Sequence, residues 1–269
     1  MTLPKRPVAY VLAATNHGSM IVNRFDYAQP PGGEGFGVGL QLLNNSCFDP
    51  EEVDLALGLL GLRHRFFGHG VVAIDGGANL GVHTLSWARH MHGWGRVIAF
   101  EAQEQVFYAL AGNIALNNCW NATARWAALG ERDGHIDIPE PDYLRPGSFG
   151  SLELRAKGRP EYIGQPISYE AGDCVRTPMQ SIDALDLPRL DFLKLDVEGM
   201  ELDVLRGARA TIGRCKPIVM AEVVKSDKSA LLRFVEDLGY TTITEGMGLN
   251  MLAFHASDPS RGELRRVED

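Results

Sequence analysis

The chain has 269 residues, of which 45% are hydrophobic and 22% are charged, and its formal net charge is −8. This length suits one large globular domain with small additions, and the composition is that of an ordinary globular protein. The negative charge argues against a protein that grips nucleic acid or anionic lipid over a wide surface.

The cysteines and the N-terminal residues bear on the cellular compartment in which the protein is expected. The four cysteines contain no CxxC pair, so we expect free thiols in a reducing cytosol rather than a zinc site. The apolar run over residues 10–14, YVLAA, is too short for a signal-peptide core or a membrane span. The sequence therefore predicts a soluble, cytoplasmic protein.

Residues 1–48 form an N-terminal extension with a weak pattern. The apolar run over 10–14 predicts a strand, and the glycine-rich stretch over 31–40 predicts a flexible loop. We interpret this loop as a lid over the substrate, with an inert linker as the alternative. The stretch from Asp49 to Glu52, DPEE, is typical of a helix start, and this helix is expected to end at Gly61.

From residue 71 the sequence alternates between buried strands and amphipathic helices. The predicted strands are 71–74, 96–101, 124–129, 191–196 and 217–224, and a final hairpin pairs 240–244 with 250–256. The predicted helices are 80–91, 103–118, 199–212 and one from Ser226 to Gly239. This alternation predicts a mostly parallel sheet with helices on both faces.

The rhythm breaks between about 135 and 178, where prolines, glycines and short strand-like segments predict an insertion. We expect a main domain over 49–258 that contains this insertion, followed by a polar C-terminal tail over 259–269. In a parallel sheet of this kind, ligands bind at the carboxyl ends of the strands.

An aspartate stands where the first strand meets a glycine-rich turn. The order from Asp75 to Gly81, DGGANLG, differs from the GxGxxG dinucleotide fingerprint. A carboxylate at this mouth would repel a phosphate, but it suits a ligand with an ammonium group such as S-adenosylmethionine. Backbone N–H groups near Gly77 and Asn79 can take the carboxylate of the same ligand. A tight turn with no ligand is the alternative.

Further positions extend the predicted cofactor site. Glu101 ends the second strand and can accept both ribose hydroxyls, and the adenine is expected near the end of the third strand. Thr84 would bond the methionine carboxylate or its own helix backbone. The predicted cofactor-binding residues are Asp75, Gly76, Gly77, Ala78, Asn79, Gly81, Thr84, Glu101, Ala102 and Ala128.

Several longer segments resemble the FkbM-type family of class I methyltransferases. They are IDGGANLGVHT over 74–84, VIAFEA over 97–102, FLKLDVEGMELDVLRGA over 192–208 and PIVMAEV over 217–223. The resemblance covers about 50–256. It implies a Rossmann-like α/β fold with a seven-stranded, mostly parallel sheet and an antiparallel last strand. It also implies methyl transfer from S-adenosylmethionine, typically to a hydroxyl of a sugar or a natural product.

Three residues are the candidates for the chemistry at the acceptor. Asp196, at the end of the fourth strand, is expected to act as a general base or to orient the acceptor. Glu222 is an acid in an otherwise apolar strand, so it contacts substrate or satisfies backbone amides. His83 follows the glycine turn and is the third candidate.

Other roles for the nearby charges stay open. As the alternative to a role at the site, Lys194 and Glu198 would form an ion pair that shapes the loop, and Glu198 and Glu201 would stabilise the next helix through its dipole. Asp196, Glu198 and Glu201 together would offer oxygen ligands to Mg²⁺, but no histidine or asparagine joins them. We therefore predict no required metal.

The sequence favours an S-adenosylmethionine-dependent O-methyltransferase that acts on a small-molecule or carbohydrate acceptor. The alternatives are N-methylation, a methyltransferase-like binding protein without turnover, and a nicotinamide-dependent oxidoreductase. The last lacks GxGxxG and a Tyr-x-x-x-Lys pair. A nucleic-acid partner is not expected from the acidic balance, and the oligomeric state is not predicted.

Overall fold

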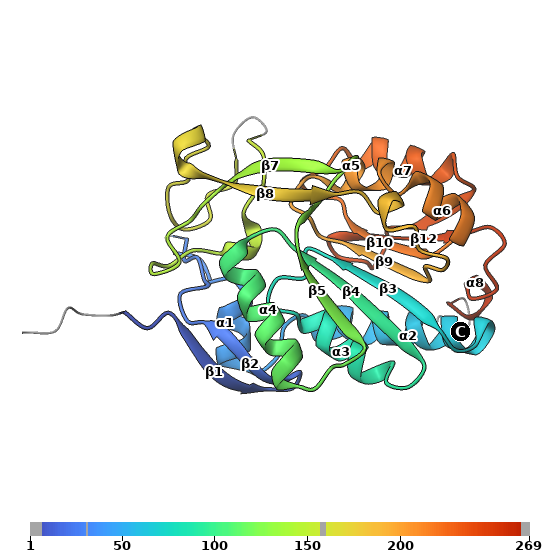
Figure 1. Ribbon diagram of the computed structural model, residues 1–269, viewed down its shortest axis with the longest axis horizontal. Coiled ribbons are helices and arrows are strands. Elements are labelled where there is room, and N and C mark those ends of the chain that lie inside the picture. The colour runs from blue at the N-terminus through green and yellow to red at the C-terminus, as the bar shows by residue number, and fades with distance from the viewer. Residues whose placement is uncertain (1–6, 31, 157–159, 265–269) are drawn as a thin grey trace, which may run out of the picture.

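A computed structural model describes residues 7–30, 32–156 and 160–264 of the chain (Figure 1). Predictions that fall on 1–6, Pro31, 157–159 and 265–269 lie outside the described residues. The division into an extension, a main domain and a tail stays a prediction.

The central feature is a seven-stranded sheet with the order β11-β12-β10-β9-β3-β4-β5. Its strands are β3 (Val71–Gly76), β4 (Gly95–Glu101), β5 (Ala122–Trp126), β9 (Phe192–Leu195), β10 (Ile218–Glu222), β11 (Tyr240–Ile243) and β12 (Asn250–His255). Neighbours pair in parallel except around β12, which runs antiparallel to both β10 and β11. The predicted fold class and the predicted final hairpin are confirmed.

Helices cover both faces of the sheet (Figure 1). One face carries α2 (Pro50–Phe67), α3 (Val82–His90) and α4 (Glu104–Leu116), and the other carries α5 (Glu201–Arg206), α6 (Arg209–Cys215) and α7 (Lys228–Glu236). Along β3, Ala73 packs into the core below the sheet and Ile74 into the core above it. Burial on both faces explains why this strand is apolar without alternation.

Three predicted boundaries were wrong. Helix α2 passes through Gly61 to Phe67, because Leu59, Leu60 and Arg63 are buried and outweigh the cost of about 1 kcal/mol for a glycine in a helix. The helix expected over 199–212 breaks at Gly207, which lies against the backbone of the turn at 130–131. The cap of α7 is Asp227, which accepts from the Ala230 N–H, and not Ser226.

The segment expected as one strand over 124–129 also divides. Its first part is β5, while β6 (Ala128–Leu129) joins a separate three-stranded sheet with β8 (Cys174–Gln180) and β7 (Gly134–Pro139). Strands β7 and β8 lie largely within the segment predicted as an insertion, whereas β6 precedes it. Short 3-10 turns complete the chain at Phe149–Ser151, Ala171–Asp173 and Asp183–Leu185, and α8 (Arg261–Leu264) is the last described helix.

The N-terminal segment packs against α4, in the helical layer that covers one face of the main sheet. Strands β1 (Tyr10–Thr15) and β2 (Gly18–Asn23) form a hairpin, and α1 (Val38–Asn45) follows. The buried Asn113 of α4 accepts from the Ile21 N–H at 2.5 Å and donates to the Leu80 carbonyl at 2.9 Å. One side chain therefore ties the hairpin to the loop before α3.

Candidate active site

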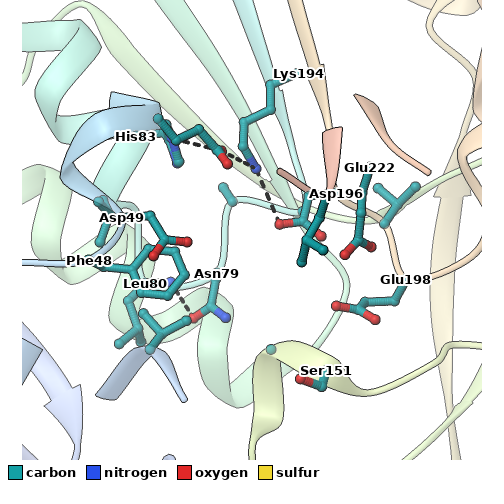
Figure 2. Close-up of a pocket in the computed structure, with 18 of the residues that line it drawn as sticks. Phe48, Asp49, Asn79, Leu80, His83, Ser151, Lys194, Asp196, Glu198 and Glu222 are labelled. Carbon is teal, nitrogen blue, oxygen red and sulfur yellow. Dashed lines mark hydrogen bonds and ion pairs between the residues drawn. The ribbon is translucent and has the colours of Figure 1, made fainter. Parts of the chain in front are cut away.

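A cavity of about 620 Å³ lies at the carboxyl ends of β3, β4, β9 and β10 (Figure 2). The loop over 77–80 and the ends of β4 and β6 form one side of it. Residues 36–55, 148–154 and 246–250 contribute the rest of the wall. The cavity is therefore at the sheet edge where the parallel topology predicts a ligand.

The glycine turn after β3 is held tightly against its neighbours. The N–H groups of Gly77 and Ala78 donate to the Phe100 carbonyl at 3.0 and 2.8 Å. Gly77 has φ +77°, and a Cβ placed on it would overlap the carbonyl oxygen of Asp196. Only glycine fits this close approach, so the turn presents bare backbone to the cavity between Gly77 and Asn79.

Glu101 is buried beside this turn. Its carboxylate oxygens accept from the N–H groups of Asn79 and Gln103 at 2.9 and 2.8 Å. Burial raises the pKa of Glu101 to about 7, although these backbone hydrogen bonds oppose the rise. Ala102 and Ala128 line the cavity nearby. A carboxylate that can accept from ribose hydroxyls therefore lies beside apolar side chains that can pack against an adenine ring.

Four of the predicted cofactor residues lie behind the wall and do not line the cavity: Asp75, Gly76, Gly81 and Thr84. Asp75 is 1% exposed, and its Oδ2 accepts from the Thr84 hydroxyl at 2.6 Å. Its Oδ1 has no hydrogen-bond partner in the described part of the chain. The expectation that Asp75 stands at the mouth is corrected, because the turn folds over this carboxylate.

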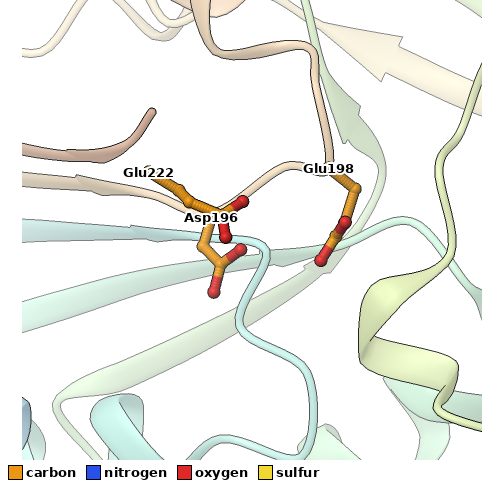
Figure 3. Close-up of side chains that lie close together, drawn as sticks. All are labelled: Asp196, Glu198 and Glu222. Atoms are coloured by element: carbon orange, nitrogen blue, oxygen red, sulfur yellow. The ribbon is translucent and has the colours of Figure 1, made fainter. Parts of the chain in front are cut away.

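Three carboxylates converge on the opposite side of the cavity (Figure 3). Asp196, Glu198 and Glu222 each place an oxygen within 4.8 Å of the others. Glu201 does not belong to this trio, since it is fully buried and accepts from the N–H groups of Val197 and Gly199. The oxygen set considered from the sequence therefore has Glu222 in place of Glu201.

Glu222 differs from its two neighbours in having a buried oxygen without a partner among the described residues. Its Oε2 is buried without a hydrogen bond from any described residue. Burial and the charges of Asp196 and Glu201 raise the pKa of Glu222 to about 7, against the opposing charges of Lys225 and Lys194. Glu198 also has a raised pKa, mainly through burial and Asp196.

Lys194 pairs with Asp196 at 3.3 Å, while Glu198 pairs with Lys225. The predicted Lys194–Glu198 pair is therefore wrong. Burial alone would lower the pKa of Lys194, but the charges of Asp196 and Glu52 outweigh it and raise that pKa. Lys194 is 3% exposed and remains charged.

Glu52 was not identified as a site residue from the sequence. Its Oε1 lies 3.2 Å from His83 Nε2 and 3.9 Å from Lys194 Nζ, and its Oε2 accepts from the Asn250 amide at 2.8 Å. Burial raises the pKa of Glu52, but His83 and Lys194 outweigh burial and bring it to about 2. In sequence this glutamate fits an ordinary first helical turn, and its partners are 31 to 198 residues away.

The FkbM methyltransferase domain model matches residues 75–242. The chain belongs to this family of S-adenosylmethionine-dependent methyltransferases. No helix of the described ranges is long and apolar enough to cross a membrane.

Several known proteins resemble this chain at low sequence identity. Methyltransferase 1 of Beauveria bassiana is 27% identical over 149 residues, which are 50% of this chain and 57% of that protein. The FkbM methyltransferase of Methylobacillus flagellatus is 19% identical, with a TM-score of 0.47 over 69% of this chain and 44% of that one. A methyltransferase of Streptococcus mutans in complex with S-adenosylhomocysteine is 12% identical, with a TM-score of 0.42 over 75% and 94%.

Proposed function

We propose that the protein transfers a methyl group from S-adenosylmethionine to a hydroxyl of a small polyhydroxylated acceptor, a sugar or a natural product. One observation carries this proposal. Glu222 lines the wall across from the glycine turn, one of its carboxylate oxygens is buried without a partner in the described ranges, and its pKa is about 7. A base with a pKa near the working pH is what a hydroxyl acceptor needs.

The residues around the glycine turn fit the cofactor. The turn from Gly77 to Asn79 would border the methionine part, but its N–H groups already donate to Phe100 and Glu101 and are not free to take a carboxylate. Glu101 would hold the ribose, and Ala102 with Ala128 the adenine. When bound, S-adenosylmethionine supplies a methyl group activated by the positive sulfonium. Asp75 and Thr84 lie behind the turn and would not touch the cofactor. They would support the shape of the turn, and the charge of Asp75 contributes to the raised pKa of Lys194.

On the acceptor side, Glu222 takes the proton of the hydroxyl. Asp196, paired with Lys194, orients the acceptor and favours the positive charge of the methyl donor. His83, 3.2 Å from Glu52, holds the end of α2 against α3 and serves as a positioning residue rather than as the base. In-line placement of the acceptor supplies much of the remaining acceleration.

The acceptor wall comes largely from outside the family match. Phe36, Val38 and Phe48 line the cavity, so part of the predicted lid over 31–40 does reach the site. We propose that this segment selects the acceptor. The acidic wall suits a nucleic-acid phosphate poorly, and the four free cysteines are in keeping with a cytoplasmic location.

Two measurements test the proposal. Calorimetry should show micromolar binding of S-adenosylmethionine and S-adenosylhomocysteine and no binding of NAD. Transfer of labelled methyl to a panel of hydroxyl and amine acceptors should give ethers, with Glu222→Gln slow and the exposed control Glu236→Gln unaffected. Methylated amines would reassign the reaction to N-methylation. Cofactor binding without any product would favour a binding protein.

A further inference from the structure

The cavity wall is strongly acidic. Its carboxylates come from both helices and strands: Asp49, Glu51, Glu52, Glu101, Asp196, Glu198 and Glu222. Among the described lining residues, Lys194 is the only lysine and there is no arginine. The wall therefore carries several more negative than positive groups.

The available lysines are already engaged. Lys194 is within 4 Å of both Asp196 and Glu52. Lys225, behind the wall, contacts Glu198, Glu161 at 2.8 Å and the Ser151 carbonyl at 3.0 Å. An anionic acceptor that entered the cavity would find no lysine free of a carboxylate partner, and it would meet the repulsion of the remaining acids.

The uncompensated charge has a definite place. Asp49 and Glu51, at the start of α2, line the rim and have no ion pair with any described lysine, arginine or histidine within 4 Å. Asp49 has a raised pKa, because burial and the neighbouring Glu52 disfavour its charged form. Asp49 makes no capping hydrogen bond to its own helix, and its carboxylate is opposed only by a hydrogen bond from Gln41 and by the more distant charges of His83 and Lys194.

Aromatic and apolar groups stand beside these acids. Phe48 lies next to Asp49 at the cavity (Figure 2), and Phe36, Leu55 and Met247 line the same region. An aromatic face beside carboxylates is a favourable surrounding for an organic ammonium group, since both attract positive charge.

We propose that the acceptor carries a protonated amine, as an amino sugar or amino alcohol does, and that the acids at the rim recognise it. The inference rests on the proposed methyl transfer at this cavity, and it names the acceptor class. The amine is a recognition group in addition to the hydroxyl that receives the methyl. Acceptors with a phosphate or carboxylate are excluded.

A divalent metal is the competing cation, and the ion pairs argue against it. A metal would draw on Asp196, Glu198 and Glu222, but two of these already hold a lysine ammonium. The acids without a lysine partner at the rim belong to a different element, α2, so they do not complete a compact oxygen cage.

The test uses calorimetry on the full chain loaded with S-adenosylhomocysteine, with acceptors matched in shape and different in charge. One set is glucosamine, glucose and glucuronate, and a second is 2-phenylethylamine, 2-phenylethanol and phenylacetate. We expect the amine to bind about 10- to 100-fold tighter than the neutral member of its set, as one charged hydrogen-bonded contact provides. The anion should bind more weakly than the neutral compound, and added salt should shrink the difference.

The double variant Asp49→Asn/Glu51→Gln should lose about tenfold or more of the amine preference. The matched control is Asp54→Asn, an exposed aspartate of the same helix that does not line the cavity. Circular dichroism would confirm that both variants fold.

Equal affinity across the three charges, or no detectable binding of either amine, would overturn the inference. Stoichiometric binding of Mg²⁺ or Mn²⁺ that displaces the amine would overturn it in favour of a metal. Failure to bind S-adenosylhomocysteine at all would instead contradict the proposed function, which keeps the two failures distinct.

Discussion

The two halves of the cavity are built differently. The cofactor half, from Gly77 to Leu129, is formed at the ends of the neighbouring strands β3 and β4 and by β6 of the second sheet. The acceptor half gathers side chains from residues 36–55, 148–154 and 246–250, which are far apart in the sequence. The first half fits a ligand shared by a whole family, and the second can change without disturbing the sheet.

The largest effect is expected from a substitution in the backbone turn of the cofactor half. In Gly77→Ala the new Cβ would meet the Asp196 carbonyl at a left-handed φ. We expect a loss of about 2–6 kcal/mol in the free energy of unfolding, from overpacking and backbone strain together. Binding of S-adenosylhomocysteine should fall below detection. Denaturant unfolding and calorimetry measure the two effects.

The matched control is Gly58→Ala in α2, where a Cβ meets no atom within 4 Å. This change should stabilise the protein slightly, by about 0.5–1 kcal/mol. Normal cofactor affinity in Gly77→Ala would show that the turn is not the cradle we infer.

The second largest effect is expected from a substitution of Glu222, which lies between the two halves. Replacing it by glutamine should lower kcat by about 10²- to 10⁴-fold and leave cofactor affinity nearly unchanged, because a general base acts only in the chemical step. Its pKa of about 7 also sets a pH dependence. The base must be ionised, so kcat/KM should fall as the pH drops below about 7 and level off above it.

The bound sulfonium would favour the ionised carboxylate, so the midpoint in kcat should lie at a lower pH than the midpoint in kcat/KM. Glu236→Gln, on the exposed face of α7, serves as the control. A pH profile that keeps its acid limb in Glu222→Gln would assign the limb, and the base, to another group.

The same contrast explains what the sequence could predict. The order of strands and helices follows from apolar runs and turn residues, so the sheet topology, the glycine turn and the acids at the strand ends were found. The orientation of Asp75 was not, because a one-dimensional pattern places a residue at a strand end but does not show which way the next turn folds over it.

The acceptor half was largely missed for a related reason. Asp49 and Glu52 fit the sequence pattern of a helix N-terminus, although Asp49 makes no capping hydrogen bond. Nothing local indicates that Glu52 lies beside His83, Lys194 and Asn250. Contacts over such separations depend on how α2 packs, which the alternation of residues does not encode. Glu222 was found only because an acid stands out in an apolar strand.

Asp26 connects two segments of the acceptor half through buried hydrogen bonds. Its replacement tests whether that half depends on a few such contacts. Its buried carboxylate accepts from the N–H groups of Gly39 and Phe149, at 2.9 and 3.0 Å, and so joins α1 to the insertion. Asp26→Ala should cost about 1–3 kcal/mol for each N–H left unpaired. Acceptor binding should weaken while cofactor binding stays, and Asp137→Ala on the exposed edge of β7 is the control.

The effect of Asp26→Ala should depend on pH in a definite direction. Burial raises the pKa of Asp26 to about 6, although the two N–H groups oppose the rise. A carboxyl with a raised folded-state pKa contributes most stability below its unfolded pKa, and this contribution is lost as the pH rises through about 6. The free-energy difference between wild type and variant should therefore be larger at pH 5 than at pH 8. A difference that grows with pH would mean that the ionised form is favoured.

The smallest expected effect concerns Lys225, which joins the insertion to the carboxylates of the cofactor strands through Glu161, Ser151 and Glu198. Its charge lowers the pKa of Glu222, so Lys225→Gln should move the acid limb of the rate profile to higher pH, by no more than about one unit. Lys228→Gln, an exposed neighbour on α7, should leave the limb in place. If Lys225 only held the insertion in place, its replacement would lower the melting temperature without shifting the midpoint of the acid limb. A shifted midpoint would show instead that Lys225, although it lies behind the cavity wall, tunes the base electrostatically.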